Sequence, residues 1–227
     1  MSSAPDAAGP AGVPSGPVEV VDLVRRAIHE GDFAPNQRLV EADLSVQFGA
    51  SRAAVRTALV QLAAEGLVER VQNRGARVRA VSLEEAIEIS EVRMVVEGLC
   101  AAKAAQRASD EDRAALQEIA TGMRAAVERG DVFGYSELNR RLHAAVRSVG
   151  GQAVADGVLE RLRGQNVRHQ FRLALLPGRA SVSLPQHLEI VDAICAGDAD
   201  RAEAAMRTHL ASVIETLPQV AQGTSGS

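Results

Sequence analysis

Aromatic residues are scarce in this chain, whose 227 residues include no tryptophan, one tyrosine and four phenylalanines. No apolar run approaches the roughly 18 residues that a transmembrane helix needs, which excludes a membrane span of that kind. There is no basic and apolar leader of the secretory type, so we expect a cytoplasmic protein. Cys100 and Cys195 lie in apolar helical segments and make no disulfide framework, which favours a reducing compartment and two small core residues.

Apolar residues, many of them alanine and leucine, make up 46% of the chain and predict a largely helical globule. The length allows two domains with sizeable cores, which we place at residues 18–80 and 82–217. Residues 1–17 are rich in Ala, Gly, Pro and Ser, and residues 218–227 are small and polar. Both ends are expected to be disordered tails.

The pattern between Glu41 and Ala80 predicts two helices followed by a hairpin. Asp43–Phe48 is a short amphipathic helix, after which Gly49 supplies a left-handed turn conformation. Ser51 can cap a second, longer helix, because its hydroxyl accepts from backbone N–H groups in the first turn. Two alternating runs then flank the turn signal Asn73-Arg74-Gly75. This order of elements is typical of a winged helix-turn-helix that binds duplex DNA.

Arginine is concentrated in the same segment. Residues 51–79 contain six arginines and two glutamates, a local charge of +4 in a chain of net charge −4. Arg52 and Arg56 stand one turn apart at the start of the second helix, from where they can reach phosphates or guanine edges in a major groove. Arg74 lies in the predicted turn of the hairpin. A basic run is often only a solvated face, but this order and spacing favour a polyanion such as DNA.

The string SRAAVRTALVQLAAEGLVERVQNRGARV resembles the GntR family of bacterial transcription regulators, and residues 18–80 fit throughout. The resemblance implies that Arg52 and Arg56 contact operator DNA and that the wing glycine, Gly75, approaches the minor groove. The residues that we assign to DNA binding are therefore Ser51, Arg52, Arg56, Arg74 and Gly75.

The second domain has the pattern of six consecutive helices without strands. Ser82 with Glu85, and Ser109 with Asp112, have the spacing of capping boxes. Apolar residues recur at helical spacing between glycine and proline signals that end each helix. The expected helices are Leu83–Ala108, Ser109–Gly130, Asp131–Val149, Val154–Leu175, Leu184–Ala196 and Asp200–Leu217. The predicted fold class is mainly α: an N-terminal winged helix-turn-helix followed by a six-helix bundle.

Four residues of this bundle could form a metal site. Asn139 and His143 are four residues apart and share one helix face. His187 lies ten residues before the turn at Gly197–Ala199 and His209 ten residues after it, so a reversal there brings the two imidazoles level. If His143 faces them, three nitrogens and one oxygen can hold zinc or another divalent transition metal. From geometry alone, separate core histidines are an equal alternative.

Residues 82–217 resemble the FCD ligand-binding domain of the FadR branch, in its six-helix, VanR-type form. In many such domains an Asp or Asn, a His four residues later and two more histidines bind a metal. The residues that match this order are Asn139, His143, His187 and His209. The resemblance implies a divalent transition metal as cofactor, with zinc as the first expectation and nickel or another metal as the alternative.

Arg93 is the candidate for binding an effector. In similar domains an arginine at this place faces the cavity and helps to bind a carboxylate that the metal also coordinates, which implies a small carboxylate effector. From the residues alone, Arg93 could equally form a surface ion pair with Glu97, four residues later.

A metal-dependent hydrolase is the alternative function, because three histidines on an open metal can activate water. His187-Leu188-Glu189 imitates the start of a zinc deaminase signature, but the paired-cysteine motif is absent. On a helix, Glu189 points about 200° away from His187, which is poorly suited to a general base. No activated serine or cysteine, phosphate-binding glycine loop or nucleotide fingerprint is found. We predict that the protein is not an enzyme; a metal-storing scaffold is a third alternative.

Together these features predict a ligand-responsive, DNA-binding transcription regulator, most simply a repressor. Its expected partners are duplex operator DNA, a small carboxylate effector and a second copy of the chain, without a membrane. A homodimer is expected because one recognition helix reads only a short half-site and two-fold symmetry doubles it.

Overall fold

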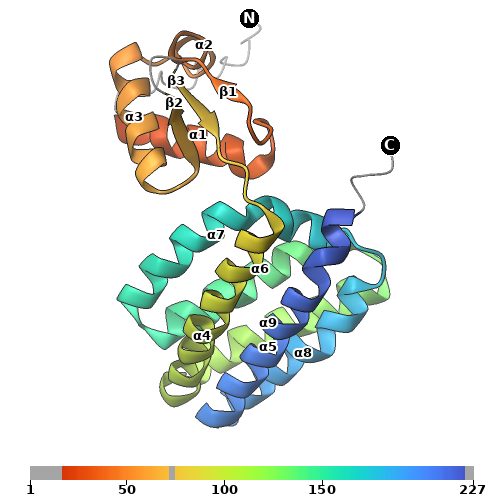
Figure 1. Cartoon of the computed structure of the whole chain (residues 1–227). Helices are drawn as coiled ribbons and strands as arrows, with labels where there is room; N and C mark the ends of the chain where they lie inside the picture. The colour runs from red at the N-terminus through yellow and green to blue at the C-terminus, as the bar shows by residue number, and fades with distance from the viewer. Residues whose placement is uncertain (1–16, 72–74, 223–227) are drawn as a thin grey trace, which may run out of the picture. The chain divides into compact units, whose positions relative to one another are not determined.

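The computed structural model describes residues 17–71 and 75–222. The chain divides into two compact units, Met1–Ala80 and Val81–Ser227 (Figure 1). The first unit contains α1 (Pro17–Glu30), β1 (Arg38–Leu39), α2 (Glu41–Gln47), α3 (Arg52–Ala64), β2 (Val68–Val71) and β3 (Gly75–Val78). The second contains α4 (Leu83–Arg107), α5 (Asp110–Glu128), α6 (Val132–Gly150), α7 (Ala153–Ala174), α8 (Arg179–Cys195) and α9 (Ala199–Gln222). The predicted fold class is confirmed.

The core of the first unit lies between three helices and a small antiparallel sheet with strand order β1-β3-β2. Val24 of α1 and Val55 and Leu62 of α3 are fully buried in it. β3 pairs with both neighbours, and its Arg77 lies opposite Arg38 of β1. The sequence pattern did not predict β1, because a strand of two residues is too short to show alternation.

α2, the turn at Gly49 and α3 form the helix-turn-helix. Gly49 has a φ of 63°, in the left-handed region that glycine adopts without strain. The Ser51 Oγ accepts from the backbone N–H of Ala54 at 3.1 Å and so caps α3, as predicted. The apolar face of α3, which includes Val55 and Leu59, is buried, so its remaining positions are left for solvent or a ligand.

α4 packs against α6, α7, α8 and α9 in the second unit, and α5 packs against α6 and α8 (Figure 1). The main core of the bundle includes Leu116 and Met123 of α5, both fully buried. Ser82 caps α4, and Ser109 and Asp112 form a complete capping box at α5. None of the described helices is both long and apolar enough to cross a membrane.

Two helix boundaries differ from the prediction by five residues, while other boundaries, such as those of α2, differ by one or two. α8 begins at Arg179 instead of Leu184, and α9 continues through Pro218 to Gln222, so the predicted tail 218–227 is helical over its first residues. Pro218 suggested the end of the last helix, but a proline removes only one N–H donor and can bend a helix without ending it. α1 already begins at Pro17, since proline suits a first helical turn. Residues 1–16 and 223–227 of the predicted tails lie outside the described residues.

Candidate functional site

Three histidines converge inside the second unit. His143 of α6, His187 of α8 and His209 of α9 are all buried, and one ring nitrogen from each lies within 4.8 Å of the other two. The ring centroids of His187 and His209 are 4.2 Å apart. The ring centroid of His143 lies 5.7 Å from that of His187 and 5.3 Å from that of His209. The α8–α9 hairpin and the facing helix α6 thus bring together three of the four side chains that were predicted to bind metal.

α6 can approach α4 closely because residue 150 is glycine. A Cβ at Gly150 would lie 2.7 Å from the backbone oxygen of Cys100 on α4, closer than real Cβ atoms come to such an atom. This packing lets His143 meet the buried Glu97 of α4, with 2.5 Å between Nδ1 and Oε2. The close approach of the two helices therefore gives one cluster histidine a carboxylate partner.

Glu97 also binds Arg93, so it joins two predicted site residues. Its Oε1 accepts from Arg93 Nε at 2.8 Å and Nη2 at 2.7 Å. Burial by itself raises the pKa of Glu97, but the charges and hydrogen bonds of Arg93 and His143 together hold this pKa well below its usual range. Glu97 is therefore an ionised acceptor, and His143 donates to it through Nδ1–H. The ion pair between Arg93 and Glu97, which their four-residue spacing allowed, is formed, but it is buried instead of lying on the surface.

A chain of hydrogen bonds fixes the tautomer of His187. Ser183 Oγ donates to the backbone oxygen of Arg179 at 3.0 Å, and this oxygen can only accept. Ser183 Oγ therefore accepts from the hydroxyl of Tyr135 at 2.9 Å, and the Tyr135 oxygen accepts from His187 Nδ1–H at 2.9 Å. Burial raises the pKa of Tyr135 to about 12, so its hydroxyl keeps its proton at neutral pH.

His209 also donates through Nδ1, because this atom lies 3.1 Å from the side-chain oxygen of Gln186, which can only accept. All three histidines thus use Nδ1 as a donor within the protein, so Nε2 is the nitrogen that each has left for a ligand. Burial lowers the pKa of His187 and that of His209 well below the usual value. Neutral imidazoles of this tautomer are metal ligands, and outer partners of this kind orient them.

Two orphaned polar atoms support a metal at this place. His187 Nε2 and Asn139 Oδ1 are buried without a hydrogen-bond partner among the described residues. Asn139 lies one turn before His143 on α6. Buried polar atoms without partners are uncommon and costly. A divalent cation at the histidine cluster would give the His187 nitrogen a partner, and Asn139 Oδ1 is the nearest unpartnered oxygen along α6 from His143.

Sequence reasoning missed the partners that hold this cluster. Tyr135 and Gln186 come from α6 and α8, and no local pattern marks them, because their roles depend on which helices meet. Arg179 was missed because α8 was expected to begin five residues later. Once the helix is extended, the spacing of Arg179, Ser183 and His187 at every fourth residue does place them on one face.

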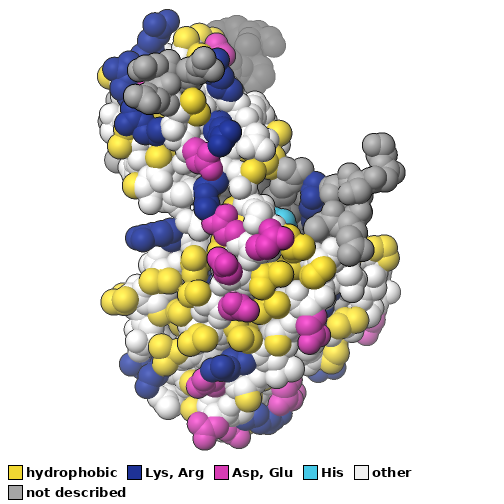
Figure 2. Space-filling view, viewed as in Figure 1, with side chains coloured by type: hydrophobic (Ala, Val, Ile, Leu, Met, Phe, Trp, Pro, Cys, Tyr) yellow, Lys and Arg dark blue, Asp and Glu magenta, His cyan; other side chains and the backbone are white. Residues whose placement is uncertain are grey.

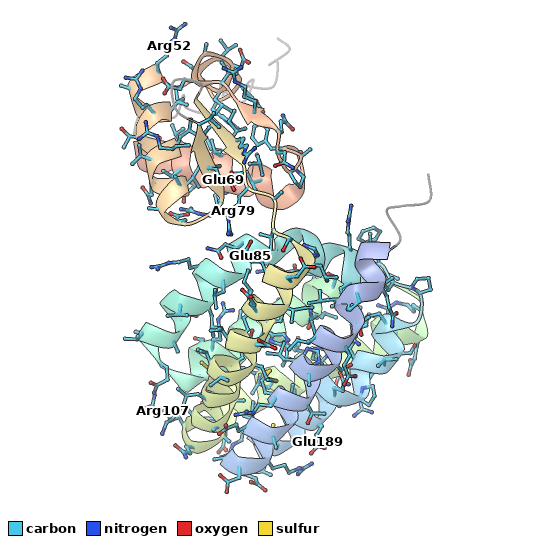
Figure 3. The ribbon with its side chains drawn as sticks, viewed as in Figure 1. Arg52, Glu69, Arg79, Glu85, Arg107 and Glu189 are labelled. Atoms are coloured by element: carbon cyan, nitrogen blue, oxygen red, sulfur yellow. The ribbon has the colours of Figure 1, made fainter. Side chains whose placement is uncertain are left out.

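The first unit exposes the arginines that were predicted to meet DNA. Arg52 and Arg56 are exposed on α3, and Arg52 projects outward in Figure 3. Arg56 forms a bidentate ion pair with Glu41 of α2, donating from Nη2 to Oε2 at 2.8 Å and from Nε to Oε1 at 3.1 Å. Its side chain is still 63% exposed. Arg52, one turn earlier, is the freer of the two to reach a phosphate.

The wing supplies Gly75, whose φ of 85° lies in the left-handed region. A Cβ there would lie 2.9 Å from the backbone oxygen of Leu39 on β1, so a side chain is excluded by both conformation and space. Arg74, the other predicted wing residue, lies outside the described residues. Gly75 and Arg56 line a common groove of about 450 Å³.

A winged helix with exposed arginines and a helical bundle with a buried histidine cluster define a bacterial DNA-binding regulator with a sensing domain. Comparison with known families agrees with this class. The model of the bacterial regulatory proteins of the gntR family matches residues 18–78, and the FCD domain model matches residues 88–212. The chain belongs to the GntR family and carries an FCD domain, as in the FadR branch that the sequence predicted.

Individual relatives support this assignment. The chain is 28% identical over 214 residues to the HTH-type transcriptional repressor RspR of Escherichia coli strain K12, covering 93% of this chain and 94% of the relative. It is 30% identical over 226 residues to an Escherichia coli regulatory protein whose name refers to the L-lactate dehydrogenase operon, with coverages of 88% and 85%. The structure of Escherichia coli McbR/YncC matches with a TM-score of 0.76 and 21% identity over 89% of this chain and 97% of that one. These matches do not support the hydrolase alternative.

Proposed function

We propose that this regulator is a repressor whose operator affinity is set by a small carboxylate bound at a metal ion in the FCD domain. The observation that carries the proposal is the convergence of three buried imidazoles, each with Nδ1 engaged and Nε2 available. Repressors among the relatives support the direction of regulation. Zinc is the first expectation for the ion and nickel the alternative.

The residues that would hold the ion are Asn139, His143, His187 and His209. When bound, the ion would supply a positive charge and open coordination positions for an acid. Arg93 would bind the same carboxylate, while its hydrogen bonds to Glu97 hold the Arg93 guanidinium in place. An effector of this kind changes operator affinity only by binding two conformations of the protein unequally, and metal and effector affinities are then coupled as well.

For the operator half of the proposal, α3 enters the major groove with Arg52 and Arg56, and the N-terminus of α3 at Ser51 faces a phosphate. Gly75 of the wing would approach the minor groove, and Arg74, which lies outside the described residues, keeps its predicted role in DNA binding. In the first unit, which contains no lysine, Figure 2 shows several Arg side chains on the surface, as phosphate binding requires.

Melting the purified protein tests the effector half. We expect its melting temperature to rise by several degrees when zinc and a binding acid are both present, because ligands that bind only the folded state stabilise it. The measurement is a thermal-shift screen of small acids against chelator-treated protein, with and without restored zinc or nickel. No shift with any acid, in the presence of either metal, would count against a carboxylate effector.

An apolar stripe on α4 supports a homodimer. Val92, Val95 and Leu99 recur at helical spacing and are 49%, 53% and 42% exposed. Figure 2 shows hydrophobic side chains gathered on the bundle face that carries α4. Contiguous apolar patches on soluble proteins commonly mark protein–protein interfaces, and a second copy offers the matching stripe.

Val95→Glu is therefore expected to weaken the dimer at least about thirtyfold, because the symmetric interface would bury two carboxylates without partners. Sedimentation equilibrium across a concentration series measures the change. Val46→Glu is the control, since Val46 is an 85% exposed residue of α2 in the first unit and is not part of this stripe. Equal dimer dissociation constants for Val95→Glu and the wild type would show that this stripe of α4 does not form the dimer interface.

A further inference from the structure

Arg179, the first residue of α8, is a buried cation with no carboxylate partner among the described side chains. It is 8% exposed. Its Nη1 donates to the neutral Ser212 Oγ at 2.9 Å and Thr216 Oγ1 at 3.2 Å on α9. Its Nη2 is buried and has no hydrogen-bond partner in the described structure. A guanidinium in such surroundings is left without an opposite charge.

The other buried arginines of the bundle show how unusual this is. Arg93 is paired with Glu97, and Arg147 is paired with Asp156 and Glu160. Burial without an opposite charge is costly, and burial accordingly lowers the pKa of Arg179 from its ordinary value. A charge that the fold leaves uncompensated is explained most directly by an anion that arrives from outside.

Arg179 is also connected to the histidine cluster through polar residues of α8 and α9. Arg179, Ser183 and His187 share one face of α8, and the chain of hydrogen bonds from His187 ends on the Arg179 backbone oxygen. On α9, Ser212 and Thr216 follow His209 on one face.

We propose that Arg179 binds a second anionic group of the effector, so that the effector is a short dicarboxylic acid. This inference rests on the proposed carboxylate site at the metal. At that site, three neutral imidazoles and a neutral amide would not balance the charge of a divalent ion, so one carboxylate of the effector is needed there. Glu97 cannot supply this charge, because it is already shared by Arg93 and His143. One carboxylate binds at the metal end, and the other pairs with Arg179 between α8 and α9. The Cα atoms of Arg179 and His187 are separated by roughly 12 Å of helix axis, so an acid that reaches both ends is short.

Calorimetric titration of the zinc-loaded, full-length protein tests this with acids matched in carbon number. The probes are succinate, glutarate and adipate, each compared with butyrate, pentanoate or hexanoate. We expect the best diacid to bind at least about tenfold more tightly than its matched monoacid, because a buried guanidinium gains a charged partner. Arg179→Met should abolish this preference while leaving zinc and monoacid affinities within about twofold of the wild type.

Arg207→Met, which removes an exposed arginine of α9, is the matched control and should keep the preference. The ligand-free melting temperature of Arg179→Met should be unchanged or higher, because an uncompensated buried charge is removed. A fall of several degrees would instead make Arg179 a structural tie to α9 and overturn the proposal. Monoacids that bind as tightly as diacids would refute the role of Arg179 and leave the metal-bound carboxylate standing. Failure of every acid to bind the zinc-loaded protein would refute both.

Discussion

Replacing Arg52 and Arg56 together with alanine is expected to reduce specific operator binding by at least about a hundredfold, because each guanidinium contact with a base or phosphate is worth roughly 1–3 kcal/mol. Both side chains are exposed at the start of the capped helix α3. Arg56 is also oriented by its two-point contact with Glu41, so little of its conformational freedom remains to be lost on binding. The variant should melt as the wild type does, since neither arginine contributes to the core.

The measurement uses DNA fragments that the wild-type protein selects from genomic DNA, with affinities compared by fluorescence anisotropy at one fixed salt concentration. Arg124→Ala with Arg129→Ala is the control, because it removes the same charge from exposed positions of the bundle. Undiminished binding by the Arg52 and Arg56 variant, at a salt concentration where the control binds normally, would show that α3 does not read the operator.

Replacing His187 with alanine is expected to lower zinc affinity by more than about a hundredfold, beyond the loss that is usual for an outer partner of a ligand. His187 has the clearest geometry of the cluster, since its Nε2 is buried and unpartnered while Nδ1 donates to Tyr135. Competition with a chromophoric chelator gives the affinity. The rise in melting temperature that zinc produces in the wild type should disappear in the variant.

His169→Gln is the matched control for this experiment. His169 lies on α7 of the same unit, outside the cluster, and its Nε2 is hydrogen-bonded to the backbone oxygen of Val81. Its replacement should leave zinc affinity unchanged. If His187→Ala binds zinc as the wild type does, the metal is held elsewhere and the histidine cluster is a packed polar core.

The sequence predicted the helices of this fold well because their boundaries depend on local chemistry. Ser51, Ser82 and Ser109 each cap a helix as their spacing indicated. The convergence of the histidines could also be predicted, since equal distances from one turn place two side chains level on a helical hairpin. The end of the last helix at Pro218 was wrong, because local rules treat proline as a terminator, whereas packing can carry a helix through it.

What surrounds the candidate site could not be predicted in the same way. Glu97 had an obvious local partner in Arg93, yet its contact with His143 depends on how closely α6 approaches α4. Tyr135 and Gln186 became relevant only when α6, α8 and α9 were placed together. The unpaired state of Arg179 depends on every side chain around it, so it becomes visible only in three dimensions.

Gly75 limits how this regulator could acquire new targets. Its left-handed backbone and the nearby Leu39 oxygen require glycine at the start of β3, whichever side chains surround it. A change of operator preference then has to come from α3 or from other side chains of the first unit. Specificity in this domain can evolve around Gly75, but not by exchange of that residue.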